Sequence, residues 1–234
     1  MLDLVWKDIV QGRRMLAFYL AMGAVIGIGL AFALENVGAV IALQMTVSAY
    51  GFAIRSTYDE DKNGALLFLK GLPLSDAAIV VSKFLSTLAV AIGFAVFFGG
   101  VAAIGQGIIG PRSGIGMPGA PGGGTGAGAL LEPLISVATL FGALMVILGV
   151  YLAMFFWLGY ARAAAYNRVV MLGVFAAVMA GSTVLQRLNV QPPAWIGALE
   201  HSLRVPSLVA AAGLVIYALS RAVSIAGVRA RDWS

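Results

Sequence analysis

Long apolar stretches dominate this chain of 234 residues and restrict the solvent in which it can fold. Crossing about 30 Å of hydrocarbon takes roughly 20 helical residues, and several stretches between charged residues reach that length. Hydrophobic residues make up 61% of the chain and charged residues 11%, and the mean hydropathy is +0.96. A water-soluble protein of this size has too little interior for so much apolar surface. The sequence therefore predicts an integral membrane protein.

The apolar stretches favour helices over the strands of a β-barrel. They lack the alternation of apolar and polar residues that barrel strands need, and backbone groups in lipid must be hydrogen bonded within the protein. We predict an all-α integral membrane protein that forms a single transmembrane domain with six transmembrane helices. The expected spans are about 15–34, 37–54, 82–108, 133–159, 168–186 and 205–226.

The basic residues predict the orientation of these spans. With the six spans above, 12 of the 15 Lys and Arg residues fall on the side that holds both termini. Positive residues gather on the cytoplasmic side of membrane proteins. We therefore expect a multi-pass protein of the plasma membrane with both termini in the cytoplasm. The net charge of +5 then reflects topology, so no nucleic-acid partner is predicted. The Gly- and Pro-rich segment 109–131 would be an external loop.

Residues 1–14 have the pattern of an amphipathic helix that lies in the membrane interface. Leu2, Val5, Trp6 and Ile9 follow the helical spacing i, i+3, i+4 and i+7, with polar residues such as Asp8 elsewhere on the wheel. The alternative is a simple basic anchor that precedes the first span. Both alternatives place this segment beside membrane lipid.

The cytoplasmic loop 55–81 contains the signals of a short helix at Gly64–Lys70. Asn63 can cap its start, while Gly71 and Pro73 can end it. Ser75 can then cap a new helix that leads into the third span. The apolar surface of the short helix, at Ala65, Leu66, Phe68 and Leu69, must either lie among lipid headgroups or dock in a groove of another protein.

The chain lacks the motifs of an enzyme. It has no cysteine and a single histidine, His201, so neither a metal site nor a catalytic triad is expected. The phosphate-binding motif G-x-x-x-x-G-K-[ST] does not occur, so any nucleotide hydrolysis must take place in another protein. Among the few polar residues within the spans, Gln44 and Ser48 are candidates for a translocation path.

Three short motifs in the cytoplasmic loop resemble those of a transporter family. They are Asp59-Glu60 after Tyr58, Leu72-Pro73-Leu74-Ser75, and Ile79-Val80-Val81-Ser82-Lys83-Phe84. This pattern is similar to that of the membrane (permease) subunits of type-2 ABC exporters, in the branch of the phenol-soluble modulin exporter permeases. Asp76 stands where that branch often has a basic residue, and Asp61 is inserted before Lys62.

The resemblance implies that the short helix is a coupling helix that docks on a separate cytoplasmic ABC ATPase subunit. Its site residues here would be Asp59, Glu60, Lys62, Ala65, Leu66, Phe68, Leu69, Lys70, Leu72 and Pro73. ATP and Mg would be bound by that partner and not by this chain. The permease would work as a homodimer, or as a heterodimer with a sister permease, and export an amphipathic or hydrophobic peptide, antibiotic or lipid-like substrate. The second internal loop, Arg162–Arg168, would contribute less.

Two functions from other classes compete with this interpretation. A non-transporting membrane scaffold could use the same surface helix and loop to recruit a cytoplasmic partner. An intramembrane enzyme is disfavoured because no span supplies paired catalytic groups.

Overall fold

The computed structural model describes residues 2–34, 37–109, 127–170, 172–173 and 204–230, and every element in these ranges is helical. Residues 160–170 form a short helical segment. The named helices are α1 (Leu2–Leu34), α2 (Val37–Lys62), α3 (Ala65–Gly71), α4 (Asp76–Ile109), α5 (Ala127–Leu158) and α8 (Arg204–Ala230). No strand occurs in this part of the chain, which confirms the predicted all-α class for it.

Four of these helices are long and apolar enough to cross a membrane. They are α1, α4, α5 and α8, with the qualifying stretches Leu2–Ile26, Asp76–Val101, Val137–Leu158 and Pro206–Ala230. The predicted span 168–186 lies mostly outside the described residues, as do His201 and residues 110–126 of the predicted external loop. The count of six spans and the orientation therefore stay predictions.

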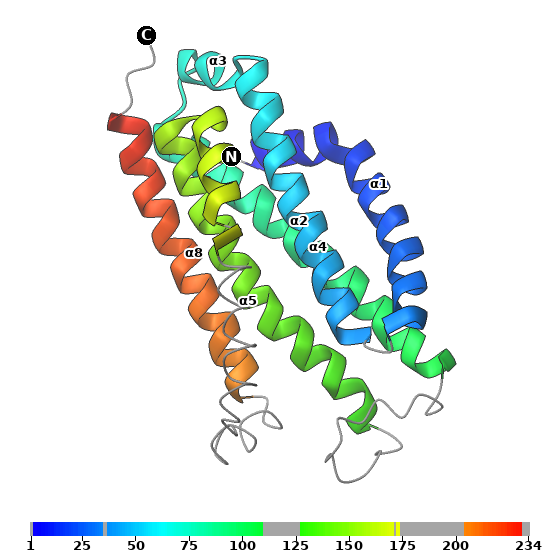
Figure 1. The fold of residues 1–234 in the computed structure, drawn as a ribbon. Helices are drawn as coiled ribbons and strands as arrows, with labels where there is room; N and C mark the ends of the chain where they lie inside the picture. Colours follow the sequence, from blue (N-terminus) through cyan, green and yellow to red (C-terminus); the bar gives the residue numbers. More distant parts are fainter. Residues whose placement is uncertain (1, 35–36, 110–126, 171, 174–203, 231–234) are drawn as a thin grey trace.

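The long helices run side by side, and α3 lies across one end of the bundle (Figure 1). The start of α1 and the last turn of α8 lie at this same end, which we call the α3 end. The first turns of α1 cross the α3 end before the helix turns and follows α2 and α4 (Figure 1). The predicted interfacial segment 1–14 and first span are thus one continuous helix with a bend.

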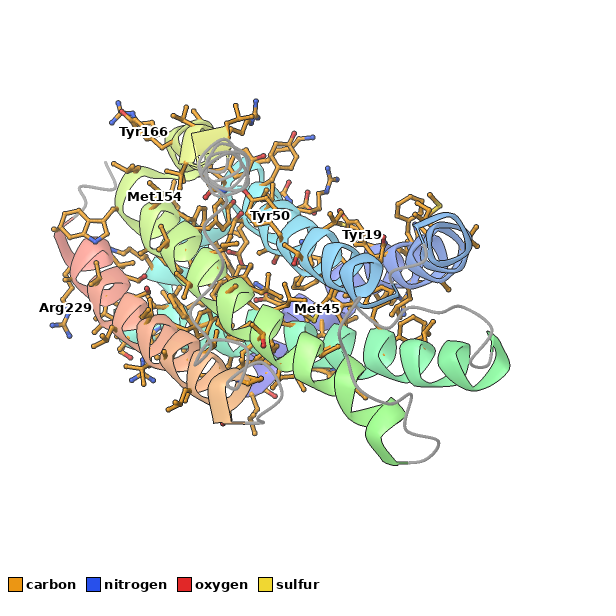
Figure 2. All side chains as sticks on the ribbon, turned by 60° about the horizontal axis from the view of Figure 1, so that its bottom comes forward. Tyr19, Met45, Tyr50, Met154, Tyr166 and Arg229 are labelled. Carbon is orange, nitrogen blue, oxygen red and sulfur yellow. The ribbon has the colours of Figure 1, made fainter. Side chains whose placement is uncertain are left out.

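Aromatic and aliphatic side chains from α2, α4 and α5 form the core. Phe52, Phe94, Tyr151 and Phe155 are almost fully buried there. Met45 lies among the helices, whereas Tyr166 and Arg229 lie at the periphery (Figure 2). The outer faces of the long helices are also apolar, with residues such as Val25, Val96, Leu208 and Leu219 exposed. A helix that is apolar on every side requires lipid or other helices around it.

α5 and α8 pack closely against each other, and glycines permit the approach. A methyl group added at Gly213 would overlap the backbone of Gly142, and one added at Gly142 would overlap the backbone at Val209. Small residues let membrane helices approach until their backbones touch. Tyr217 of α8 also donates a hydrogen bond to the Phe84 carbonyl at 2.7 Å, which ties α8 to α4.

Several predicted element boundaries need correction. α5 begins at Ala127, inside the segment 109–131 that was predicted to be an external loop. Gly159 has a φ of 79° and ends α5, and a new helical segment starts directly behind it, with the Ala163 amide donating to the Gly159 carbonyl at 3.0 Å. Glycine suits this left-handed conformation because it has no Cβ. The predicted loop Arg162–Arg168 is therefore helical.

Candidate functional site

The coupling-helix prediction falls on α3, which spans Ala65–Gly71. Gly64 precedes it with a φ of 61°, and its carbonyl accepts the first helical hydrogen bond from the Phe68 amide at 3.1 Å. The predicted caps are therefore wrong by one position each: Gly64 replaces Asn63 at the start, and Gly71 lies within the last turn, followed by the extended residue Leu72. Glycine tolerates the left-handed turn that redirects the chain out of α2.

The next helix begins as predicted. The Ser75 hydroxyl accepts a hydrogen bond from the Ala78 amide at 3.2 Å, which satisfies one of the free amides at the start of α4. The link between α3 and α4 is short, and Leu74 donates its amide to the Leu72 carbonyl at 2.7 Å within it. α3 is consequently held between two capped turns.

The apolar side chains of α3 point to two different sides. Leu69 is buried and belongs to the core cluster, whereas Phe68 is 69% exposed and Leu67 is 55% exposed. Leu72 and Pro73, just after the helix, are also exposed. The side chain of Leu66 lies outside the described residues. Adjacent exposed apolar side chains at the end of a bundle are typical of an interaction surface.

Polar contacts fix α3 against the ends of two long helices. The Lys70 ammonium lies 3.8 Å from the Asp76 carboxylate at the start of α4 and donates to the Val228 carbonyl of α8 at 3.3 Å. Partly exposed ion pairs of this kind add little to stability, so their main effect is to set the position of α3. Because these contacts fix α3, the exposed side chains of Leu67 and Phe68 have a fixed position at this end of the bundle.

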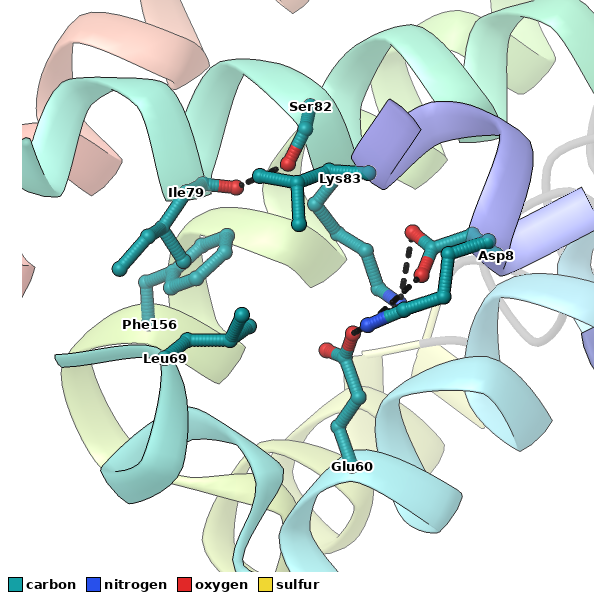
Figure 3. A pocket seen from close by; sticks show the side chains of 9 residues that line it. Asp8, Glu60, Leu69, Ile79, Ser82, Lys83 and Phe156 are labelled. Carbon is teal, nitrogen blue, oxygen red and sulfur yellow. Dashed lines mark hydrogen bonds and ion pairs between the residues drawn. The ribbon is translucent and has the colours of Figure 1, made fainter. Parts of the chain in front are cut away.

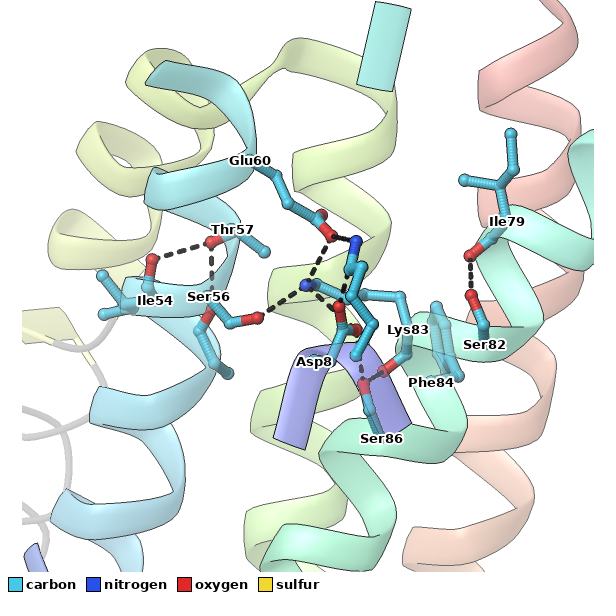
Figure 4. Close-up of polar contacts among 12 residues, drawn as sticks. Asp8, Ile54, Ser56, Thr57, Glu60, Ile79, Ser82, Lys83, Phe84 and Ser86 are labelled. Atoms are coloured by element: carbon cyan, nitrogen blue, oxygen red, sulfur yellow. Dashed lines mark hydrogen bonds and ion pairs between the residues drawn. The ribbon is translucent and has the colours of Figure 1, made fainter. Parts of the chain in front are cut away.

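Beneath α3 lies a cluster of charges, which we call the ion cluster and define as Lys7, Asp8, Glu60 and Lys83. All of them except the partly exposed Lys7 are buried. The Lys83 ammonium lies 3.0 Å from the Glu60 carboxylate and 3.3 Å from the Asp8 carboxylate (Figure 4). Lys7 approaches the same two carboxylates at 3.6 and 3.4 Å. The two acids balance the two lysines, so the cluster has no net charge, and it joins α1, α2 and α4.

Hydroxyl groups complete the coordination of the ion cluster. Lys83 donates to the Ser56 hydroxyl at 2.6 Å, and the Ser86 hydroxyl donates to the Asp8 carboxylate at 3.0 Å. Buried charges are tolerated only when they are paired and hydrogen bonded in this way. The cluster therefore locks the first turns of α1 to the ends of α2 and α4.

The ion cluster and α3 share one small cavity. Charged groups of Asp8, Glu60 and Lys83 lie on one side of it, and Leu69 of α3 lies with Ile79 and Phe156 on the other (Figure 3). The remaining space is about the size of a water molecule. Leu69 thus packs α3 against this small cavity, whose other walls come from α1, α2, α4 and α5.

The other predicted site residues are divided between the surface and the interior. Ala65 is partly exposed and Lys62 is exposed, with its ammonium 5.8 Å from the Tyr58 ring centre. Asp59 pairs with Arg55 at 3.2 Å on α2. Glu60, in contrast, faces inward, so its carboxylate serves the ion cluster and not the outer surface.

The two candidate path residues lie elsewhere, within the bundle on α2. Gln44 and Ser48 are both buried, and Gln44 lies beside Gly23 of α1. The Ser48 hydroxyl has no hydrogen-bond partner in the described part of the protein. A buried hydroxyl without a partner is uncommon, because leaving it unpaired costs free energy.

Sequence reasoning missed the inward role of Asp8 and Lys83. Asp8 was expected on the polar face of an interfacial helix, and Lys83 was used only to predict topology and as part of the motif Ile79–Phe84. The available signal was the spacing of Ser82, Lys83 and Ser86, which puts hydroxyls beside a lysine within an otherwise apolar helix. Nothing in the sequence identified Asp8 as its partner, because that contact joins distant segments.

A comparison with known families identifies the family of this chain. The sequence model of the family described as ABC-2 family transporter protein matches residues 3–229. None of the curated proteins matches the chain. The family match covers almost the whole sequence, including α1, the α3 end and α8. The protein therefore belongs to the ABC-2 family of transporter membrane proteins.

Proposed function

We propose that this chain is the permease subunit of an ATP-driven exporter, and that α3 is the coupling helix on which a separate ABC ATPase docks. The observation that carries the proposal is the outward position of Leu67 and Phe68 on a short helix whose next residue, Leu69, is buried. An apolar pair that is exposed at the end of a bundle suits insertion into a groove of another protein. The narrower likeness to phenol-soluble modulin exporters supports export as the direction of transport.

Energy for transport must then enter through α3. The sequence has no phosphate-binding loop, so ATP and Mg would be bound by the partner. A partner can shift the permease between states only through contacts that differ between those states. When the ATPase displaces α3, Leu69 and Lys70 transmit the movement to the enclosed region around Phe156 and to the end of α8. Leu67 and Phe68 would contact the ATPase, and Leu69 and Lys70 would pass the displacement of α3 on to the long helices.

A single copy of this chain supplies half of a transport path in our proposal. The other half is a second copy or a sister permease, and the exposed apolar faces of the long helices leave surface for it as well as for lipid. Gln44 and Ser48 line the path, where the unpaired Ser48 hydroxyl can bind a passing cargo. An amphipathic or hydrophobic cargo suits this setting, because the described middle portions of the spans carry no charge.

Co-purification with an ABC ATPase tests the proposal. Phe68→Asp places a charge on the exposed face of α3 and is expected to abolish complex formation. Trp6→Asp is the matched control, because Trp6 is an exposed aromatic residue on α1, outside both α3 and the segment Arg162–Arg168. Both variants should elute like the parent protein in size-exclusion chromatography. Equal ATPase binding by the two variants would refute the coupling-helix assignment.

The ATPase rate separates an exporter from a scaffold. A permease in lipid is expected to change the rate of the bound ATPase, and Phe68→Asp should remove that change. A scaffold would retain the ATPase at an unaltered rate.

A further inference from the structure

A groove between α1 and α2 has the properties of a ligand site that the proposed function does not use. Its volume is about 410 Å³, within the range of roughly 300–1,000 Å³ that is common for small-molecule sites. α1 contributes residues between Asp8 and Tyr19, and α2 contributes residues between Phe52 and Asp59. It is separate from the small cavity beneath α3, although Asp8 lines both.

The lining of this groove changes from polar to apolar along its length. α1 and α2 are antiparallel neighbours, so Gln11 and Arg14 on α1 lie at the same end of the groove as Arg55 and Ser56 on α2. Towards the middle of the bundle α1 contributes Met15, Phe18 and Tyr19 to the lining, and the Phe52 ring of α2 lies against Gly12. This gradient matches a molecule that stands parallel to the helices with a polar head at the α3 end and an apolar tail.

Arg14 and Arg55 mark the ends of the apolar runs of α1 and α2 on the same side of the bundle. Arg14 is the last charged residue before the apolar run of α1, and Arg55 is the first charged residue after the apolar run of α2. Basic residues at the ends of membrane spans lie at the level of the lipid headgroups. The polar end of the groove is therefore at the depth where lipid phosphates are found.

The charges at the polar end are arranged to favour an anion. The Asp59 carboxylate is engaged by Arg55 at 3.2 Å, and the Asp8 carboxylate is engaged within the ion cluster by Lys83 at 3.3 Å and Ser86 at 3.0 Å. Arg14, by contrast, pairs with no carboxylate among the described residues. Both acids that line the groove are thus occupied by partners, and one guanidinium is left to bind a negative group.

We propose that this groove binds one phospholipid with an anionic headgroup, with its phosphate on Arg14 and an acyl chain along Phe18 and Tyr19. Guanidinium groups bind phosphate oxygens through paired, charge-assisted hydrogen bonds. The apolar walls exclude water from the first part of the chain. This inference does not rest on the docking of an ATPase, because the permease alone contains the complete site.

Native mass spectrometry of the purified permease in detergent tests the lipid site. The probes are phosphatidylglycerol, which is anionic, and phosphatidylcholine, which is zwitterionic. The parent protein should retain one phosphatidylglycerol in preference to phosphatidylcholine. Arg14→Gln should weaken phosphatidylglycerol binding about tenfold, as expected for the loss of one charge-assisted contact. Arg13→Gln is the matched control, because Arg13 is an exposed neighbour that does not line the groove, and it should bind like the parent.

A second variant keeps both arginines. Gln11 is an exposed residue of the groove lining, and Gln11→Trp should fill the polar end and exclude the lipid without any change of charge. Equal loss of binding in Arg14→Gln and Arg13→Gln would show a general charge effect and overturn the proposal. Undiminished phosphatidylglycerol binding by Gln11→Trp, or equal retention of phosphatidylcholine by the parent, would overturn it as well.

Discussion

The Lys83 ammonium of α4 lies 3.0 Å from the Glu60 carboxylate of α2, and both side chains are almost completely enclosed. The two residues come from opposite flanks of α3, so their contact closes the loop that carries the exposed Leu67 and Phe68. Asp8 adds α1 to the same contact at 3.3 Å. The position of α3 therefore depends on charges outside it, one of which, Asp8, is far from it in the sequence.

Replacing Lys83 with methionine should destabilise the protein strongly. The change leaves two carboxylates in the interior with only the partly exposed Lys7 nearby, and breaking a buried ion pair from one side costs about 3–5 kcal/mol. We expect a clearly lower midpoint of thermal unfolding in detergent. Lys62→Met is the control, because Lys62 is exposed, and its midpoint should not change. Similar midpoints for the two variants would mean that the ion cluster contributes little to the free energy of unfolding.

Glu60→Gln should partly rescue Lys83→Met. The second substitution removes one of the two carboxylates that then share Lys7 alone, so the double variant is expected to unfold at a higher temperature than Lys83→Met alone. Directly contacting residues usually show coupling free energies of roughly 0.5–3 kcal/mol. A double-mutant cycle of thermal stability measures this coupling. Additive effects of the two substitutions would contradict a direct interaction.

Leu69→Ala should loosen α3 without removing its exposed face. The substitution takes a buried side chain away from Ile79 and Phe156, a change that costs roughly 2–5 kcal/mol in a well-packed core. Hydrogen–deuterium exchange of residues 65–71 should become faster. Leu67→Ala is matched in chemistry and lies on the exposed side, so it should leave the exchange unchanged. The same exchange rate in both variants would show that Leu69 does not anchor the helix.

Gly213→Ala should disturb the contact between α5 and α8. The added methyl group would overlap the backbone of Gly142, and an overpacked core loses about 1–3 kcal/mol. Gly93→Ala in α4 is the control, because nothing lies within 4 Å of the position of its added methyl group. We expect a lower unfolding midpoint only for Gly213→Ala. A parent-like midpoint for this variant would indicate that the two helices can separate at little cost.

The helical class and the place of α3 could be predicted because both depend on local signals. Long apolar runs require helices in lipid, and the Ser75 cap and the break before it follow from the residues at those positions. The faces of α3 could not be predicted in the same way. Its sequence, Ala65–Gly71, spans less than two full turns and is apolar nearly all round, so periodicity cannot tell the docked side from the free side.

Errors at three residues illustrate this limit. Leu67 was not among the predicted surface residues, although it is exposed, and Leu69 was expected to face a partner, although it is buried. Asp8 followed the polar side of a helical wheel, yet tertiary contacts turned it inward. In each error the orientation was decided by a distant segment, which a pattern within one helix does not encode.

The separation of exposed and buried side chains within α3 has a consequence for how such a protein can evolve. In the proposed function, recognition of the ATPase would rest on the exposed Leu67 and Phe68, whereas attachment to the bundle rests on Leu69 and Lys70. Substitutions at the first pair would then alter the choice of a partner protein without repacking the interior, and substitutions at the second pair would alter rigidity without changing that choice. Specificity and mechanical strength can therefore diverge separately within seven consecutive residues.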